Sequence, residues 1–277
     1  MKMNIGREYR ERLQAGEKMF SVAIGPGNDP QKTVRIVKEF GADSIMLDNE
    51  HSLLGKETIY QYIRACRENE LPILMRAEEK TSNFRSYLDS GINAMMLPRV
   101  NTVEEATYGV RESYFPPTGH RGAGLGMSPY LLDGQKPAEM HLLQMLQYVN
   151  ENTMLFPMTE SLEGLSNLPG ILELEGVTGT LVGAHDLTID IAFKTGRINP
   201  DAFRGDLLNS DIVQETLRKI AETCKRAGKV CGVGGFSPKG YAELAKLGYQ
   251  YFGLGYVTNG DVESLRPVLE EARALIK

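Results

Sequence analysis

Cysteine and tryptophan are scarce in this 277-residue sequence, which has three cysteines and no tryptophan. Cys66, Cys224 and Cys231 are odd in number and lack C-x-x-C spacing, so neither a disulfide framework nor a thiolate zinc site is indicated. No stretch reaches the 18 consecutive apolar residues typical of a membrane span, and the charged N-terminus has no apolar core of signal-peptide length. We therefore expect a cytoplasmic protein with no membrane partner.

Charge of one sign is not concentrated anywhere in the sequence. The net charge is −5, and the 24% of residues that are charged form no long acidic or basic run. Nucleic acids and anionic membranes bind basic patches, so neither is an expected partner. With 42% hydrophobic residues, the chain can bury a sizeable core, either as one large α/β domain or as two smaller ones.

Short apolar runs alternate with helical patterns along nearly the whole chain. The runs predict eight strands, over residues 19–25, 43–48, 72–76, 93–98, 153–160, 179–184, 229–235 and 251–256. Most of these runs are nearly continuous, as is typical of parallel strands that are covered on both faces. The strict alternation predicts a single-domain (β/α)8 barrel over residues 1–277, a fold for which about 250 residues is typical.

Helical spacing occurs between these strands, over residues 30–41, 56–69, 82–91, 102–113, 214–229, 238–248 and 262–277. Gly41, Gly91, Gly228 and Gly248 each follow a last turn, as glycine often does. An open doubly wound sheet is the rival architecture, but it usually carries G-x-G-x-x-G after its first strand, where this sequence has "GPGNDP". The longest irregular stretch covers residues 113–137, and such a loop is usually functional or interfacial.

Ionisable residues gather at the C-terminal ends of four predicted strands. The segment "SIMLDNEHSLLG" shows the pattern, because a buried apolar run is followed at once by charged groups. The residues concerned are Asp48, Glu50, His51, Arg76, Glu160 and Asp186. Active sites of (β/α)8 barrels are built at these strand ends and in the loops that follow them. The sequence therefore predicts an active site at this rim.

Several stretches around these residues resemble the HpcH/HpaI family of divalent-metal-dependent pyruvate aldolases. The elements "DNEHS", "LPILMRAEE" and "LDSGINAMMLPRVNTVEEA" are similar to family motifs. So are the loop "YFPPTGHRGAG" and the segment "TESLEGLSNLPGILELEGVTGTLVGAHDLT". The resemblance extends over residues 7–257 in consistent order. It implies reversible cleavage of a 4-hydroxy-2-oxo acid into pyruvate and an aldehyde.

The resemblance also implies how metal and substrate are held. Glu160 and Asp186 match the family's two carboxylate metal ligands, and such hard oxygen donors suit Mg²⁺ or Mn²⁺, with Co²⁺ as a further option. The ion would polarise the keto oxygen and stabilise the pyruvate enolate. The backbone of Gly183, Ala184 and Asp186 matches the turn that binds the substrate carboxylate.

The remaining rim residues match groups that move protons and stabilise charge. His51 matches the base that takes the proton from the C4 hydroxyl, and Asp48 matches the partner that orients its imidazole. Arg76 matches the arginine that contacts the keto oxygen, with an ion pair to a nearby carboxylate as the plain alternative. Glu50 is expected to support metal-bound water from outside the ligand set.

The sequence departs from the family pattern at Met158 and His185, and two residues of the long loop have open roles. Met158 stands where many members have glutamine, so a polar contact to the distal part of the substrate is missing. His185 is an extra ligand, a substrate contact or an exposed side chain, of which we favour the last. His120 and Arg121 on the long loop either bind substrate or shape the loop and a subunit contact.

Other functions remain open at this point. A Schiff-base aldolase is disfavoured, because Lys18 and Lys229 lie at strand N-termini and Lys80 lies well beyond Arg76. Glycine-rich segments after the seventh and eighth strands leave room for a phosphoenolpyruvate-using or sugar-phosphate enzyme. An acyl-CoA lyase similar to citrate lyase β subunits and a non-catalytic binding barrel are further alternatives. The resemblance implies a homo-oligomer: a dimer, trimer or hexamer.

Overall fold

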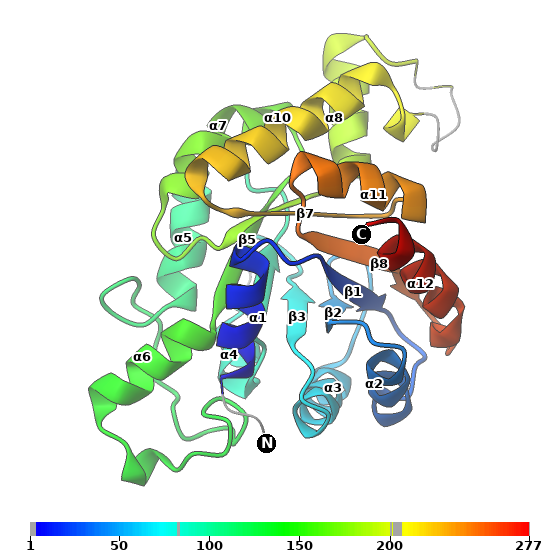
Figure 1. Cartoon of the computed structure of the whole chain (residues 1–277). Helices are drawn as coiled ribbons and strands as arrows, with labels where there is room; N and C mark the ends of the chain where they lie inside the picture. Colours follow the sequence, from blue (N-terminus) through cyan, green and yellow to red (C-terminus); the bar gives the residue numbers. More distant parts are fainter. Residues whose placement is uncertain (1–3, 82–83, 200, 202–206, 277) are drawn as a thin grey trace.

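Eight parallel strands close into a barrel in the computed structural model, which describes residues 4–81, 84–199, 201 and 207–276 (Figure 1). The strands are β1 (Met19–Ile24), β2 (Ser44–Asp48), β3 (Ile73–Arg76), β4 (Ala94–Leu97), β5 (Met154–Thr159), β6 (Gly179–Val182), β7 (Val230–Gly234) and β8 (Tyr251–Val257). Each strand pairs with the next, and β8 pairs with β1. All eight predicted strands are present, and the predicted single-domain (β/α)8 barrel is confirmed.

Helices surround the barrel in the order of the chain. They are α1 (Ile5–Gln14), α2 (Pro30–Glu39), α3 (Lys56–Glu68), α4 (Arg85–Ser90), α5 (Val103–Ser113), α6 (Leu142–Asn152), α7 (Leu162–Glu173), α8 (Ala184–Thr195), α10 (Asp211–Ala227), α11 (Pro238–Leu247) and α12 (Arg266–Leu275), with 3-10 turns η1 (Pro137–Glu139) and η2 (Val262–Leu265). The predicted helices over 82–91 and 262–277 include residues 82, 83 and 277, which lie outside the described residues. In the described part of the chain, no helix combines the length and apolarity needed to cross a membrane.

The helical patterns do not include α1, α6, α7 and α8. Pro169 lies inside α7, where it removes one backbone donor from the helix. The sixth strand ends at Val182 rather than at residue 184. Gly183 is the N-cap of α8 and Ala184 its first residue, so Asp186 lies in the first turn of a helix rather than in a loop. The backbone of a helix, and not that of a loop, therefore sets the direction of the Asp186 side chain.

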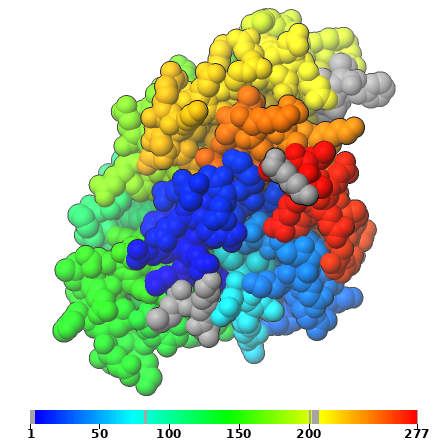
Figure 2. All heavy atoms as spheres, viewed as in Figure 1, coloured from blue at the N-terminus to red at the C-terminus, as the bar shows by residue number. Residues whose placement is uncertain are grey.

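The inside of the barrel is filled by apolar side chains from the strands. They form one cluster with Tyr9 and Leu13 of α1, which reach in from the N-terminal ends of the strands. The Tyr9 hydroxyl lies 2.9 Å from Oγ of Ser44, which fixes α1 on the barrel. Figures 1 and 2 show α1, in dark blue, across the centre of this face. The barrel is thus closed at this end, and access is left to the C-terminal ends of the strands.

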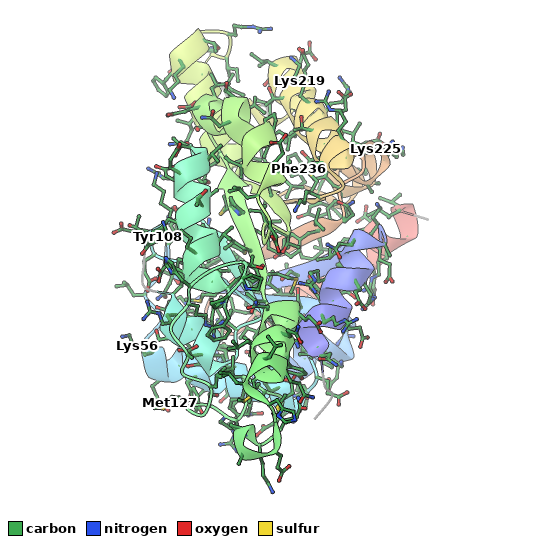
Figure 3. The ribbon with its side chains drawn as sticks, turned by 90° about the vertical axis from the view of Figure 1, so that its left-hand side faces the viewer. Lys56, Tyr108, Met127, Lys219, Lys225 and Phe236 are labelled. Atoms are coloured by element: carbon green, nitrogen blue, oxygen red, sulfur yellow. The ribbon has the colours of Figure 1, made fainter. Side chains whose placement is uncertain are left out.

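The segment between α5 and α6 has no regular structure until η1, as predicted for the long loop. Arg121 is buried there. It donates to Oδ1 of Asp89 and to the carbonyl of Ser113, and its guanidinium lies 4.9 Å from the ring centre of Phe115. These contacts indicate that Arg121 shapes the loop rather than binding substrate. The outer part of the segment is exposed, and Met127 lies at its edge (Figure 3).

A buried ion pair ties the end of this segment to the barrel. Arg67 of α3 donates to Oδ1 of Asp133 at 2.9 Å and to the carbonyl of Gly91 at 2.6 Å. The Tyr148 hydroxyl of α6 donates to the other oxygen of Asp133. Both charged side chains are almost fully buried, so each depends on the other for its counter-charge.

We expect Asp133→Asn to lower the melting temperature by roughly 5–10 °C, because it leaves the Arg67 guanidinium buried without its partner charge. Differential scanning fluorimetry measures this effect. Glu139→Gln is the matched control, because Glu139 forms an exposed ion pair with Lys136 and its loss should leave the melting temperature unchanged. Equal melting temperatures for both variants would contradict a structural role for the buried pair.

Candidate active site

A cavity of about 330 Å³ opens at the C-terminal ends of the strands. All eight strands contribute to its lining, which is apolar where Met46, Met96 and Met158 meet. Met158 therefore presents an apolar side chain to the cavity at the position singled out from the sequence. The charged and imidazole groups of the lining are His51, Arg76, His185 and Asp186. The predicted rim is thus the mouth of a real cavity.

A buried ion pair joins the ends of β2 and β3. Asp48 and Arg76 are register partners on these neighbouring strands. Arg76 donates from Nε to Oδ1 of Asp48 at 2.8 Å and from Nη2 to Oδ2 at 2.6 Å, which is a bidentate pairing. Its Nη1 lies 3.1 Å from Oε2 of Glu50. Burial opposes the charge of Asp48, but the hydrogen bonds and charge of Arg76 outweigh it and lower the pKa of Asp48.

His51 lies on the turn that follows β2. Its side chain is 55% exposed, and Nε2 is 3.5 Å from Oε2 of Glu50. Asp48 reaches this turn through its Oδ1 atom, which accepts from the backbone N–H groups of Glu50 and His51 at 3.0 and 3.4 Å. The structure thus differs from the predicted arrangement. Glu50 lies beside the imidazole, and Asp48 is committed to Arg76 and to the backbone because the chain folds back over its carboxylate.

Glu160 lies at the end of β5 and is 5% exposed. Its Oε1 accepts from the backbone N–H of Arg99, and a Cβ added at Gly183 would lie 2.2 Å from its Oε2. Burial raises the pKa of Glu160 to about 7; the Arg99 hydrogen bond opposes this, and the charges of Glu50 and Asp186 add to it. The three carboxylates therefore repel one another in a poorly solvated place.

A divalent cation is the kind of group that this arrangement fits. Among the described residues, no three His, Cys, Asp or Glu side chains form a ready ligand set. Glu160 and Asp186 supply two hard oxygen donors, and Oε2 of Glu50 is buried in an ion pair with Arg76 that lacks hydrogen-bond geometry. Mg²⁺ binds through one or two carboxylates and keeps several positions for water or substrate. A site with these carboxylates and few other protein ligands fits this coordination preference of Mg²⁺.

The N-terminus of α8 lies at the cavity, where Gly183, Ala184 and Asp186 all form part of the lining. No side chain caps this helix, and the N-terminus of a helix is a place where an anion can bind. The N–H of Gly183 is an exception, because it donates to the carbonyl of Thr159. The amide of Gly183 is therefore used between β5 and β6 in this structure, and contact of its backbone with a substrate carboxylate stays a prediction. Its contribution is the space that it leaves for Glu160.

Three side chains at the site were missed or misjudged in the sequence. Arg99 follows β4 with φ at 52°, and its guanidinium lies 3.9 Å from both Glu50 and Asp186. Tyr256 comes from β8 and lines the cavity. His185 also lines the cavity and is partly buried rather than exposed. Arg99 and Tyr256 lie at the ends of the predicted strands 93–98 and 251–256, so the rim rule would have found them if it had been applied to all eight strands.

The closed barrel, with acids, an arginine and a histidine at its strand ends, defines a barrel enzyme whose active site is at the C-terminal rim. The chain belongs to the HpcH/HpaI aldolase/citrate lyase family, whose model matches residues 25–258. It is 25% identical over 251 residues to the 2-keto-3-deoxy-L-rhamnonate aldolase of Escherichia coli O17:K52:H18 (strain UMN026), a match that covers 90% of this chain and 87% of that protein. The predicted class, a carbon–carbon lyase, is confirmed.

Solved structures show the same fold. An HpcH/HpaI aldolase from Desulfitobacterium hafniense DCB-2 superposes with a TM-score of 0.77 at 22% identity, covering 97% of this chain and 96% of that one. The citrate synthase SbnG superposes with a TM-score of 0.74 at 22% identity, covering 96% and 95%. These likenesses establish the architecture and leave the substrate to the details of the cavity.

We expect Glu160→Gln to stabilise the metal-free protein at pH 8. The folded-state pKa of Glu160, about 7, lies above its ordinary value of 4.5, so its charge costs stability as pH rises through this window. The neutral amide avoids that loss, and in EDTA its melting temperature should be higher than that of the wild type by roughly 5 °C at pH 8. At pH 4.5 the two should coincide.

The matched control is Glu163→Gln, because Glu163 is exposed on α7. Its melting temperature should follow the wild type at both pH values. A metal-free Glu160→Gln protein that is less stable than the wild type at pH 8 would show that the Glu160 charge is well compensated.

Proposed function

We propose that this protein is a class II aldolase, which uses a divalent metal ion to cleave a 4-hydroxy-2-oxo acid reversibly into pyruvate and an aldehyde. The observation that carries the proposal is the grouping of the Glu50, Glu160 and Asp186 carboxylates beside a cavity that Asp186, Arg76 and His51 line. The family and the names of the relatives support the same reaction.

Glu160 and Asp186 would hold the ion, which we propose to be Mg²⁺ or Mn²⁺, with Co²⁺ as a further option. When bound, the ion supplies Lewis acidity to the keto oxygen of the substrate. Glu50 lies against both the imidazole of His51 and the guanidinium of Arg76, so it suits a role in orienting water near the ion. The N–H groups of Ala184 and Asp186 at the start of α8, which has no side-chain cap, would receive the substrate carboxylate.

Arg76 would stabilise the negative charge that develops on the keto oxygen. Its guanidinium is held by two hydrogen bonds to Asp48 and one contact to Glu50, so it needs little reorganisation when the charge appears. The ion pair that was the plain alternative for Arg76 is therefore present. It also fixes the direction in which the guanidinium faces the cavity, so the two readings do not compete.

His51 would take the proton from the C4 hydroxyl as the C3–C4 bond breaks. The electrons of that bond pass to the pyruvate enolate, C4 becomes the aldehyde carbonyl, and the enolate then takes up a proton at C3. In the aldol direction the imidazole returns its proton to the new C4 oxygen. The half-exposed position of His51 at the cavity mouth allows direct transfer or transfer through one water molecule.

The phosphate alternative is less well supported by the loops after β7 and β8. The N–H of Gly235 donates to the carbonyl of Gly253, that of Phe236 to the hydroxyl of Tyr241, and that of Gly260 to Oδ1 of Asn28. These amides are therefore already bonded. Within the described lining of the cavity there is also no lysine to pair with a phosphate.

We also propose that the protein is a cytoplasmic homo-oligomer, either a dimer, trimer or hexamer, on the strength of the resemblance to its family. The exposed apolar side chains of Ile189 and Phe193 on α8 suit burial against another subunit. Light scattering coupled to size-exclusion chromatography gives the number of subunits, and a monomer at micromolar concentration would count against the proposal.

Pyruvate release should depend on the divalent ion. With lactate dehydrogenase as the coupling enzyme and a panel of 4-hydroxy-2-oxo acids, we expect cleavage with Mg²⁺ or Mn²⁺ and a loss of at least about 100-fold after EDTA treatment. Restoring the ion should restore the activity. Full activity in EDTA would sink the metal-dependent mechanism, and no cleavage of any panel member would favour a lyase with another substrate.

We expect His51→Ala and Arg76→Lys to lower kcat by about 100-fold or more, because the first removes the base and the second removes the fixed fork of donors. Lysine is preferable to alanine at position 76, because Arg76 neutralises two buried carboxylates. His120→Ala and Arg64→Lys are matched controls on the outer surface and should keep wild-type kcat. Wild-type turnover in either site variant would remove that residue from its role.

A further inference from the structure

Arg99 lies beside the carboxylates of the active site and has no part in the proposed reaction. It follows β4, and its Nε and Nη2 atoms lie 3.9 Å from Oε1 of Glu50 and from Oδ1 of Asp186, respectively. Both separations exceed the length of a hydrogen bond, so the guanidinium faces two carboxylates without being tied to either. The Arg99 side chain is 67% exposed, which leaves it room to move into solvent.

The backbone of Arg99 is fixed although its side chain is loose. Its N–H donates to Oε1 of Glu160, and its carbonyl accepts from Nζ of Lys80 at 3.0 Å. Lys80 is in turn paired at 2.6 Å with Glu105, in the first turn of α5. The positive φ of 52° is therefore held by a hydrogen bond on each side of the residue. The guanidinium starts from a defined position beside the carboxylates.

Arg76, which also lies against Glu50, is held differently. Its guanidinium is bidentate to Asp48 and largely buried, so Asp48 balances much of its charge and fixes its position. The guanidinium of Arg99 faces Glu50 and Asp186 at longer distances and in contact with solvent. Its charge can therefore balance these carboxylates when no ion is bound, and its side chain can leave when an ion arrives.

A divalent ion and the Arg99 guanidinium compete for the same negative charge. Asp186 is both a proposed ligand of the ion and a partner of Arg99. Positive charges held this close repel each other, and at a partly solvated mouth this repulsion is modest. Binding of the ion must therefore either push the guanidinium away from Asp186 or work against its charge. In both cases Arg99 lowers the affinity for the ion.

We infer that Arg99 is a built-in counter-charge for the metal-free site, which the divalent ion displaces and which lowers the affinity of the site for that ion. This inference rests on the proposed metal site of Glu160 and Asp186. Arg99 stabilises the grouped carboxylates between binding events, because its charge lies beside two of them. It also makes the bound ion easier to exchange with solution.

The test measures Mn²⁺ binding at pH 8, from the electron paramagnetic resonance signal of the free ion. Arg99→Gln keeps the backbone N–H that Glu160 accepts and removes only the side-chain charge. This variant should bind Mn²⁺ about 3–10-fold more tightly than the wild type. Arg99→Lys keeps the charge and should stay within about 2-fold of the wild type. Equal or weaker binding by Arg99→Gln would overturn the inference.

Two further measurements separate a charge effect from a structural one. In about 0.5 M KCl the difference in affinity should fall below about 2-fold, because salt screens charges at an exposed mouth. In EDTA, Arg99→Gln should melt roughly 1–3 °C below the wild type, and saturating Mn²⁺ should remove or reverse this difference. A difference in affinity that persists in salt, or an equal loss of melting temperature with and without Mn²⁺, would also overturn the inference.

Controls keep the inference distinct from the proposed function. Arg64→Gln removes a guanidinium of similar exposure, 60%, from the outer surface of α3 and should keep the wild-type affinity for Mn²⁺. Asp186→Asn should weaken binding by at least about 10-fold, because it removes a proposed ligand. No binding by the wild type, or undiminished binding by Asp186→Asn, overturns the proposed metal site. Binding that Asp186→Asn weakens and Arg99→Gln does not strengthen overturns the inference alone.

Discussion

The ion pair between Asp48 and Arg76 is the interaction on which the rest of the site depends. It crosses from β2 to β3 at matching register positions and is almost fully buried at Asp48. The same carboxylate accepts the backbone N–H groups of Glu50 and His51, so one buried charge fixes both a strand end and the turn beyond it. Because Asp48 and Glu50 fix the Arg76 guanidinium, its other N–H groups can stabilise a developing negative charge with little movement.

The Glu160 carboxylate at the end of β5 differs from that of Asp48, because no arginine among the described residues pairs with it in a bidentate manner. Glu160 is buried beside Glu50 and Asp186, and its Oε1 accepts a hydrogen bond from the N–H of Arg99. Arg99 adopts a positive φ to place that N–H, a conformation that costs energy in a residue other than glycine. The fold thus accepts strain and repulsion at this point. A divalent cation would relieve the repulsion, which links stability of the protein to occupancy of the site.

The barrel itself explains little about the choice of substrate. The same architecture is found in the citrate synthase SbnG and in an HpcH/HpaI aldolase, so chemistry and selectivity depend on a small number of side chains at the rim. In this chain the acidic and basic groups are concentrated on β2, β3, β5 and β6, and the wall from β7 to β1 is small and uncharged.

The sequence by itself determined the eight strands and the positions of Asp48, Glu50, His51, Arg76, Glu160 and Asp186 at one rim, because apolar periodicity is local and parallel strands present their C-terminal ends together. The partners of those groups were decided only by the tertiary structure. The turn after β2 placed Glu50, not Asp48, beside the imidazole, and the strand ladder used the N–H of Gly183. Closure of the barrel brought Tyr256 of β8 to Asp48, and packing turned His185 into the cavity. Such contacts join residues far apart in the chain, and no local pattern records which side chains a closed barrel brings together.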